Sequence, residues 1–184
     1  DKTRKVSIIA RACAIFRVKE IFIYKDGNKN KNDSILITTL LRYLETPQYF
    51  RKQLFPKIKL LKFAGVLQPL KIPSHLTTSD PQKLKVGDLR NGLIVKYKGK
   101  KFVDIGIHKL VSYYGKENSG TRITIEIKTV SPKLSIREIS QSQIKNYWGY
   151  TVKEKSNLFT FLSTWNGKII LTSRSGKVFN NSDA

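Results

Sequence analysis

The chain has 184 residues and carries 35 Lys and Arg against 13 Asp and Glu, a formal net charge of +22 at pH 7. With 40% hydrophobic and 10% aromatic residues it can bury a core, which excludes a disordered basic tail. A compact fold with this excess repels itself unless a polyanion neutralises it, and nucleic acid is the commonest such partner. A generally basic, solvated surface is the alternative interpretation.

Cysteine and histidine are too scarce for a metal site, and none is expected. Cys13 is the only cysteine, which excludes an intrachain disulfide, and its neighbours Ala12 and Ala14 predict a small core residue. No apolar run reaches the roughly 18 residues of a membrane span, and no signal peptide is visible. We therefore expect a cytoplasmic protein without a membrane partner. Because the chain has no Met and opens on Asp, we also expect its natural start to be missing.

The chain begins with a predicted helix over residues 3–18. Arg4 and Arg11 lie seven residues apart and therefore share one face of this helix. The opposite face is predicted to be an apolar stripe at helical spacing, made of Val6, Ile9, Cys13 and Phe16.

The next segments complete the opening of an α/β layer. Residues 18–24 predict a buried strand, 26–33 a polar turn and 34–44 a second amphipathic helix. Thr46 is predicted to cap a short helix that ends at Leu54, with Pro at its first helical position. Helix, strand and helix in this order are typical of α/β domains.

The pattern then changes to short strands separated by glycine. Residues 92–97, 101–106 and 121–127 predict strands, with a tight hairpin turn at 98–100, and together they favour a small barrel. An α/β pattern resumes after about residue 147, with a helix over 156–164 and a buried strand over 168–172. We therefore predict an α/β domain interrupted by a β-barrel, divided as 1–81, 82–145 and 146–184.

Residues 86–127 resemble the S1-like branch of the OB fold. The resemblance rests on a Gly-Asp start, a basic hairpin and the strand Phe102-Val103-Asp104-Ile105-Gly106. Such barrels bind RNA on one face with aromatic rings and flanking Lys and Arg. Phe102 as a core residue and the lysines as a protected sheet edge are the alternatives. The side chains predicted to bind RNA are Arg4, Arg11, Arg51, Lys52, Lys57, Lys59, Lys62, Lys96, Tyr97, Lys98, Lys100, Lys101 and Arg122.

Longer stretches resemble one enzyme family across nearly the whole chain. They are Ile9–Val18, Leu61–Leu70 with Pro73 and His75, Tyr147-Trp148-Gly149-Tyr150-Thr151-Val152, and Thr172–Gly176. They look like the archaeal and eukaryotic SPOUT-class RNA methyltransferases that carry an OB-like insert. The resemblance implies an α/β domain ending in a trefoil knot, a homodimer across the knot, S-adenosylmethionine as methyl donor and RNA as substrate.

One part of the family pattern is missing. The C-terminal strand, the Gly-Ser-Pro-type loop and the last helix, which form most of the family's cofactor pocket, do not occur in this sequence. We therefore expect a SPOUT-type domain incomplete at its C-terminal end, which binds no cofactor in this form. The best cofactor-binding candidates follow the predicted strand at 168–172, where α/β sheets place ligand loops: Thr172, Ser173, Arg174 and Gly176.

Three other residues keep two interpretations, and no catalytic residue is assigned. His75 is either an exposed loop histidine or a phosphate contact, and Trp148 and Tyr150 either stack on a base or pack in the core.

Two function classes compete, with a free single-strand or tRNA-binding factor as a third. The first is a structural ribosomal component bound to large-subunit rRNA and ribosomal proteins, favoured by a charge that would slow product release. The alternative is an S-adenosylmethionine-dependent rRNA methyltransferase lacking its C-terminal knot, favoured by the motifs.

Overall fold

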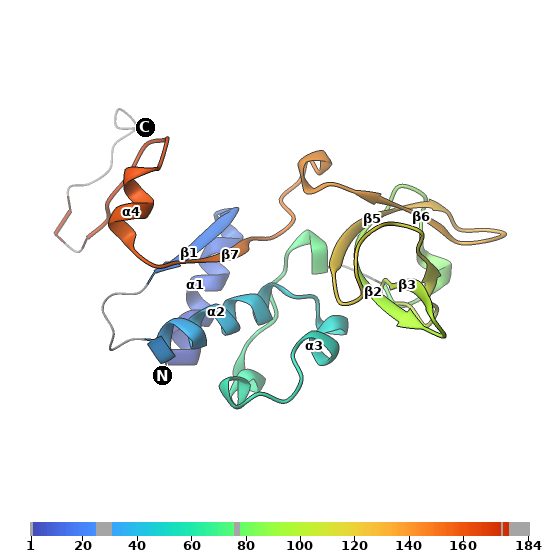
Figure 1. Cartoon of the computed structure of the whole chain (residues 1–184), viewed down its shortest axis with the longest axis horizontal. Helices are drawn as coiled ribbons and strands as arrows, with labels where there is room; N and C mark the ends of the chain where they lie inside the picture. Colours follow the sequence, from blue (N-terminus) through green and yellow to red (C-terminus); the bar gives the residue numbers. More distant parts are fainter. Residues whose placement is uncertain (1, 25–30, 76–77, 174, 177–184) are drawn as a thin grey trace.

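A computed structural model describes residues 2–24, 31–75, 78–173 and 175–176 (Figure 1). The chain is a mixed α/β protein with two separate sheets. Its helices are α1 (Lys2–Ile15), α2 (Lys31–Glu45), α3 (Gln48–Leu54) and α4 (Leu158–Ser163). Its strands are β1 (Glu20–Tyr24), β2 (Leu89–Tyr97), β3 (Lys100–Asp104), β4 (Val111–Ser112), β5 (Arg122–Thr129), β6 (Ser135–Ile139) and β7 (Thr151–Lys155). None of the described helices is long and apolar enough to cross a bilayer.

The α/β part is built around a parallel pair of strands, β1 and β7, whose register runs from Glu20–Thr151 to Tyr24–Lys155. Because β1 precedes the second sheet in the chain and β7 follows it, this pair brings together segments from both ends of the described chain (Figure 1). Helices α1 and α2 form its core with fully buried Ala10, Leu40 and Leu44. On β1, the Phe22 ring lies 4.5 Å from that of Phe161 in α4.

The second sheet has the order β4-β3-β2-β5-β6, is antiparallel throughout and curls into a nearly closed barrel (Figure 1). Ile94, Val103 and Ile125 face inward and are fully buried. The β2–β3 turn has positive φ at both Lys98 (46°) and Gly99 (79°), which is the geometry of a type I′ hairpin. The predicted barrel-like sheet and mixed α/β class are thus confirmed, whereas the knot stays a prediction.

The predicted apolar stripe of the first helix is wrong in half of its members. Ile9 is 50% and Phe16 80% exposed, whereas Val6 and Ala10 are buried. The buried face follows Thr3, Val6 and Ala10 because α2 covers that side of α1. Cys13 is half-buried and packs at the edge of this core.

Two boundaries near α2 differ from the prediction. The helix begins at Lys31, so the predicted turn is wrong over its last residues, and residues 26–30 lie outside the described part. Helix α3 has Pro47 in place of Thr46 at its N-cap, without a side-chain cap. The Thr46 hydroxyl instead donates to the Arg42 carbonyl at 2.8 Å and so bonds back into α2.

The buried strand predicted over 168–172 is not formed. Ile169, Ile170 and Leu171 are 51%, 61% and 87% exposed, and neither described sheet includes them. An apolar run is extended and buried only where a neighbouring strand pairs with it. No described strand pairs with residues 168–172.

Candidate nucleic-acid interface

The β2–β3 hairpin presents an exposed cluster of cations around an aromatic ring. Lys96, Lys98 and Lys100 are exposed, and the Lys98 ammonium lies 5.5 Å from the centre of the Tyr97 ring. Tyr97 is itself 55% exposed and meets Phe102 edge-on at 6.3 Å. Stacking surface and positive charge therefore occur together at this hairpin, which is what single-stranded nucleic acid requires.

Like charges also face one another across the hairpin. The register places Lys96 directly opposite Lys101, a pairing that repels without a counterion. The Lys101 ammonium relieves part of this by donating to the carbonyls of Lys116 and Glu117, at 3.3 and 2.7 Å. Lys101 thus ties β3 to the loop that follows β4, a role distinct from its predicted contact with RNA.

Residues 51–62 contain five of the predicted RNA-binding side chains, and one of them, Arg51, points inward. Arg51 Nε donates to the Thr46 carbonyl at 2.9 Å and Nη2 to the Leu44 carbonyl at 3.1 Å, and the guanidinium lies over the Tyr43 ring. Burial lowers the pKa of Arg51, whose bonds satisfy carbonyls at the end of α2. The other predicted members of the segment are exposed, namely Lys52, Lys57, Lys59 and Lys62.

The two arginines of the first helix are exposed, as their position opposite the buried face predicts. Arg4 and Arg11 lie on α1, whereas the hairpin lysines belong to the barrel. The predicted RNA-binding residues therefore occupy both parts of the chain, and the RNA contacts of each stay a prediction.

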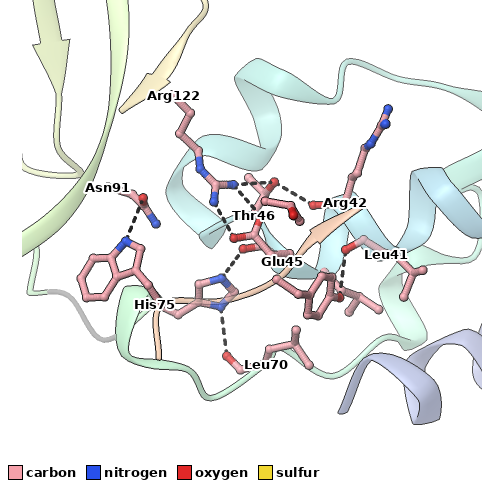
Figure 2. Close-up of polar contacts among 12 residues, drawn as sticks. Leu41, Arg42, Glu45, Thr46, Leu70, His75, Asn91 and Arg122 are labelled. Atoms are coloured by element: carbon pink, nitrogen blue, oxygen red, sulfur yellow. Dashed lines mark hydrogen bonds and ion pairs between the residues drawn. The ribbon is translucent and has the colours of Figure 1, made fainter. Parts of the chain in front are cut away.

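Arg122 on β5 joins the barrel to the end of α2 (Figure 2). Its Nη1 donates to Glu45 Oε2 at 2.8 Å and its Nη2 to Glu45 Oε1 at 2.5 Å. The two side chains are only 26% and 12% exposed. Burial raises the pKa of Glu45, and the bidentate Arg122 opposes that effect. The structure gives Arg122 an internal partner, Glu45, which no motif predicted.

His75 lies beside this pair. Its Nε2 is 2.6 Å from the Glu45 carbonyl and its Nδ1 is 3.0 Å from the Leu70 carbonyl (Figure 2). Burial lowers the pKa of His75, the two carbonyls oppose this, and nearby Arg51 and Arg122 add to the lowering. Both earlier interpretations are wrong: the ring is neither a plain exposed loop histidine nor available to phosphate, since both nitrogens face backbone carbonyls.

The Tyr-Trp-Gly-Tyr motif anchors the chain as it returns from the barrel. Tyr147 donates to the Val18 carbonyl and buried Tyr150 to the Leu41 carbonyl, both at 3.0 Å. Buried Trp148 reaches Asn91 Oδ1 on β2 at 3.4 Å. These contacts establish the core interpretation of Trp148 and Tyr150 and exclude them as exposed stacking platforms.

Gly149 in this motif has φ +126°, and a Cβ there would stand 2.9 Å from Glu45 Oε1. The position thus requires glycine both for its backbone conformation and for the approach of the Glu45 carboxylate.

The described cofactor candidates lie outside the two cavities found in the described part of the chain. Thr172, Ser173 and Gly176 are exposed, and Arg174 lies outside the described residues. One cavity of about 580 Å³ is lined by residues between 109 and 136. A second, of about 610 Å³, is lined by residues 19–20 and by residues between 141 and 153. Cofactor binding by Thr172, Ser173, Arg174 and Gly176 therefore stays a prediction. No three described His, Cys, Asp or Glu side chains cluster as a metal site.

Comparison with known proteins places the chain in one protein family. The family described as "Putative RNA methyltransferase" matches residues 1–184. The human 28S rRNA (uridine-N(3))-methyltransferase is 31% identical over 176 residues, covering 82% of this chain and 46% of the human protein. The mouse protein of the same name is 32% identical over 176 residues, with 82% and 44% covered.

An uncharacterized protein of Halobacterium salinarum is 32% identical over 139 residues, with 72% of this chain and 48% of that protein covered. The chain spans about half the length of the curated relatives it matches. Because the family match extends over every residue, the chain belongs to this RNA methyltransferase family.

Proposed function

We propose that this chain forms the RNA-binding barrel and part of the α/β domain of a SPOUT-class rRNA methyltransferase. The family match over residues 1–184 carries the proposal. The named function of the human and mouse relatives supports rRNA as the substrate class. That function also favours the methyltransferase alternative over a structural ribosomal component, for which the comparisons give no support.

The barrel is the proposed RNA-gripping module. Five antiparallel strands in the order β4-β3-β2-β5-β6, closed except between β4 and β6, suit an OB-like fold. On this basis we keep the division into 1–81, 82–145 and 146–184, with the barrel inserted in the α/β domain. Contacts with ribosomal proteins, a dimer across the knot and a cytoplasmic location remain predictions.

The hairpin's chemistry indicates how the barrel would hold RNA. Exposed Lys96, Lys98 and Lys100 supply phosphate contacts, and Tyr97 with Phe102 offers a stacking surface between them. Membership of a methyltransferase family implies S-adenosylmethionine, which would supply the methyl group. The described residues bind and orient RNA in this proposal and perform no transfer step.

The salt dependence of RNA binding tests the proposal. Replacing Lys96, Lys98 and Lys100 by Ala in the 184-residue chain removes three exposed charges and leaves Lys101, which bonds internally. For single-stranded RNA the slope of log K against log salt should flatten by roughly two units. Fluorescence anisotropy over a series of salt concentrations measures this slope.

A matched control removes the same charge elsewhere. Lys5, Lys71 and Lys145 are also exposed and lie outside the barrel strands, so replacing all three by Ala should leave most of the slope. Equal flattening in both triple variants would show binding by overall charge and would contradict a specific hairpin contact. No RNA binding by the unmodified chain would reject the proposed function itself.

A further inference from the structure

Residues 57–67 form a ridge at the outer edge of the α/β part. The ridge contains two short 3₁₀ turns, η2 (Lys59–Leu61) and η3 (Ala64–Val66). In Figure 1 these turns lie below α2, and α3 lies between them and the barrel. The ridge is therefore a surface separate from the β2–β3 hairpin.

The ridge has one buried apolar face and one exposed apolar face. Side chains three residues apart share a face of a 3₁₀ turn. One face packs against the core of α1 and α2 and consists of Leu61, Ala64 and Leu67. The next face, which we call the apolar row, consists of Leu60, Phe63 and Val66. Phe63 is 61% and Val66 69% exposed, so the apolar row lies in solvent although its neighbours are anchored in the core.

Exposed cations flank the apolar row. Lys59 and Lys62 are three residues apart and occupy the remaining face of the ridge, and Lys57 precedes them. The sequence has no Asp or Glu between positions 46 and 79. A partner that fits the ridge must therefore offer apolar surface and negative charge side by side.

The composition of the apolar row favours a protein over a nucleic acid. Leu60 and Val66 are aliphatic and provide no ring on which a base could stack. The Lys62 ammonium lies 5.4 Å from the centre of the Phe63 ring and so occupies one of its faces. RNA would neutralise the lysines but leave the aliphatic side chains in water.

We propose that the ridge docks an acidic amphipathic α-helix of a partner protein. At about 2 Å per residue the apolar row spans about 12 Å, and two turns of an α-helix span about 11 Å. Apolar side chains at positions i, i+3, i+4 and i+7 of the partner would cover the row, and its carboxylates would pair with Lys59 and Lys62. Both lysines, which the sequence favours as RNA contacts, serve a protein in this proposal. The inference goes beyond RNA binding and gives the α/β part a partner of its own.

Fluorescence anisotropy with a labelled synthetic peptide tests the ridge on the 184-residue chain. The probe is a peptide of about 16 residues of Leu, Ala and Glu, with its leucines in one helical stripe. Its isomer has the same composition, with the leucines scattered around the helix. The stripe peptide should bind about tenfold more tightly than the isomer, because the two carry equal charge and only one has an apolar face. Equal binding of the two peptides would show attraction by overall charge and would overturn the proposal.

A pair of matched variants locates the apolar contact. Phe63→Ser combined with Val66→Ser should weaken binding of the stripe peptide about tenfold and leave the affinity for single-stranded RNA unchanged. Ile15→Ser combined with Phe16→Ser is the control, because it also removes one aliphatic and one aromatic side chain that are exposed. The control should bind the peptide as the unmodified chain does, and circular dichroism should show both variants folded. Equal loss in the two variants would contradict a contact at the ridge.

Charge variants separate the ridge from the hairpin. Lys59→Ala combined with Lys62→Ala should weaken binding of the stripe peptide more than the triple replacement of Lys96, Lys98 and Lys100 does, although the triple variant loses more charge. The reverse order would mean that the peptide follows total charge, and the ridge would lose its assignment.

Two other partners of the ridge would also overturn the proposal. If Phe63→Ser with Val66→Ser weakens RNA binding as much as peptide binding, the ridge contacts RNA. If phosphatidylserine vesicles bind through the same two side chains and the stripe peptide does not, the ridge contacts a lipid surface. Failure of the peptide to bind would leave RNA binding by the hairpin, and thus the proposed function, intact.

Discussion

The barrel and the α/β part expose different chemistry. In the barrel the aliphatic side chains are enclosed, with Ile94, Ile105 and Ile125 fully buried, and the hairpin surface is basic and aromatic. In the α/β part, Ile15 at the end of α1 is 65% exposed, and Phe16, which directly follows α1, is 80% exposed.

This difference assigns different partners to the two regions. Exposed lysines stay hydrated and attract polyanions. Exposure of aliphatic side chains to water is unfavourable, and clusters of them are typical of protein contacts. The described barrel closes its own core, and the described α/β part leaves apolar side chains on its outer faces. RNA contacts are therefore expected mainly on the barrel and the α1 arginines.

One substitution made in both regions gives the largest expected contrast. Ile125→Ala empties part of the barrel core and should lower the free energy of unfolding by about 2–5 kcal/mol. Ile15→Ala removes the same atoms from an exposed helix position and should change it by less than about 0.5 kcal/mol. Urea denaturation of the two variants measures both effects. A large loss for Ile15→Ala would show that the outer face of α1 is covered in solution.

The junction between the regions gives the second contrast. Arg122→Ala leaves the mostly buried Glu45 carboxylate without its bidentate partner and should cost about 2–3 kcal/mol. It should also separate the thermal transitions of barrel and α/β part, seen by calorimetry. Arg137→Ala, which breaks an exposed ion pair with Glu126 within the barrel, is the control and should leave the transition unchanged. Equal effects of the two variants would mean that the Glu45–Arg122 pair does not couple the regions.

Arg122 also shows where sequence reasoning ends. Local patterns were sufficient for three of the barrel strands, β2, β3 and β5. Short β-type runs separated by glycine predicted these strands and Lys98-Gly99-Lys100 their turn, because both depend on neighbouring residues. The partner of Arg122 is 77 positions away in α2. A lone arginine on a strand looks the same whether it binds phosphate or a distant carboxylate, so only the tertiary structure distinguishes these roles.

The candidate site divides in the same way. The hairpin lysines and Tyr97 are contiguous in sequence and were predicted together, whereas Tyr114 and Lys133 line one cavity only because the barrel curls. The Tyr-Trp-Gly-Tyr motif was recognisable, but its function as an anchor depends on carbonyls of Val18 and Leu41. The run at 168–172 has strand composition, and composition carries no information on whether a neighbouring strand is present.

The smallest expected effect is a dependence of stability on pH through His75. Burial lowers the pKa of His75 in the folded chain, so between pH 7.5 and 5.5 the unfolded state binds the proton more readily. Stability then falls as the pH drops through the unfolded value near 6.5. His75→Gln should remove this fall from thermal unfolding measured over the same range, and His108→Gln, which alters the other, exposed histidine, should retain it.

The opposite result would be equally informative. The neutral ring can donate to only one of the Glu45 and Leu70 carbonyls, at 2.6 and 3.0 Å, and turns a lone pair toward the other. The protonated ring donates to both but places its charge near Arg51 and Arg122. If stability rises on acidification and His75→Gln abolishes the rise, the two carbonyls outweigh burial and the arginines. The end of α2 and the Leu70 backbone would then be held together by an imidazolium.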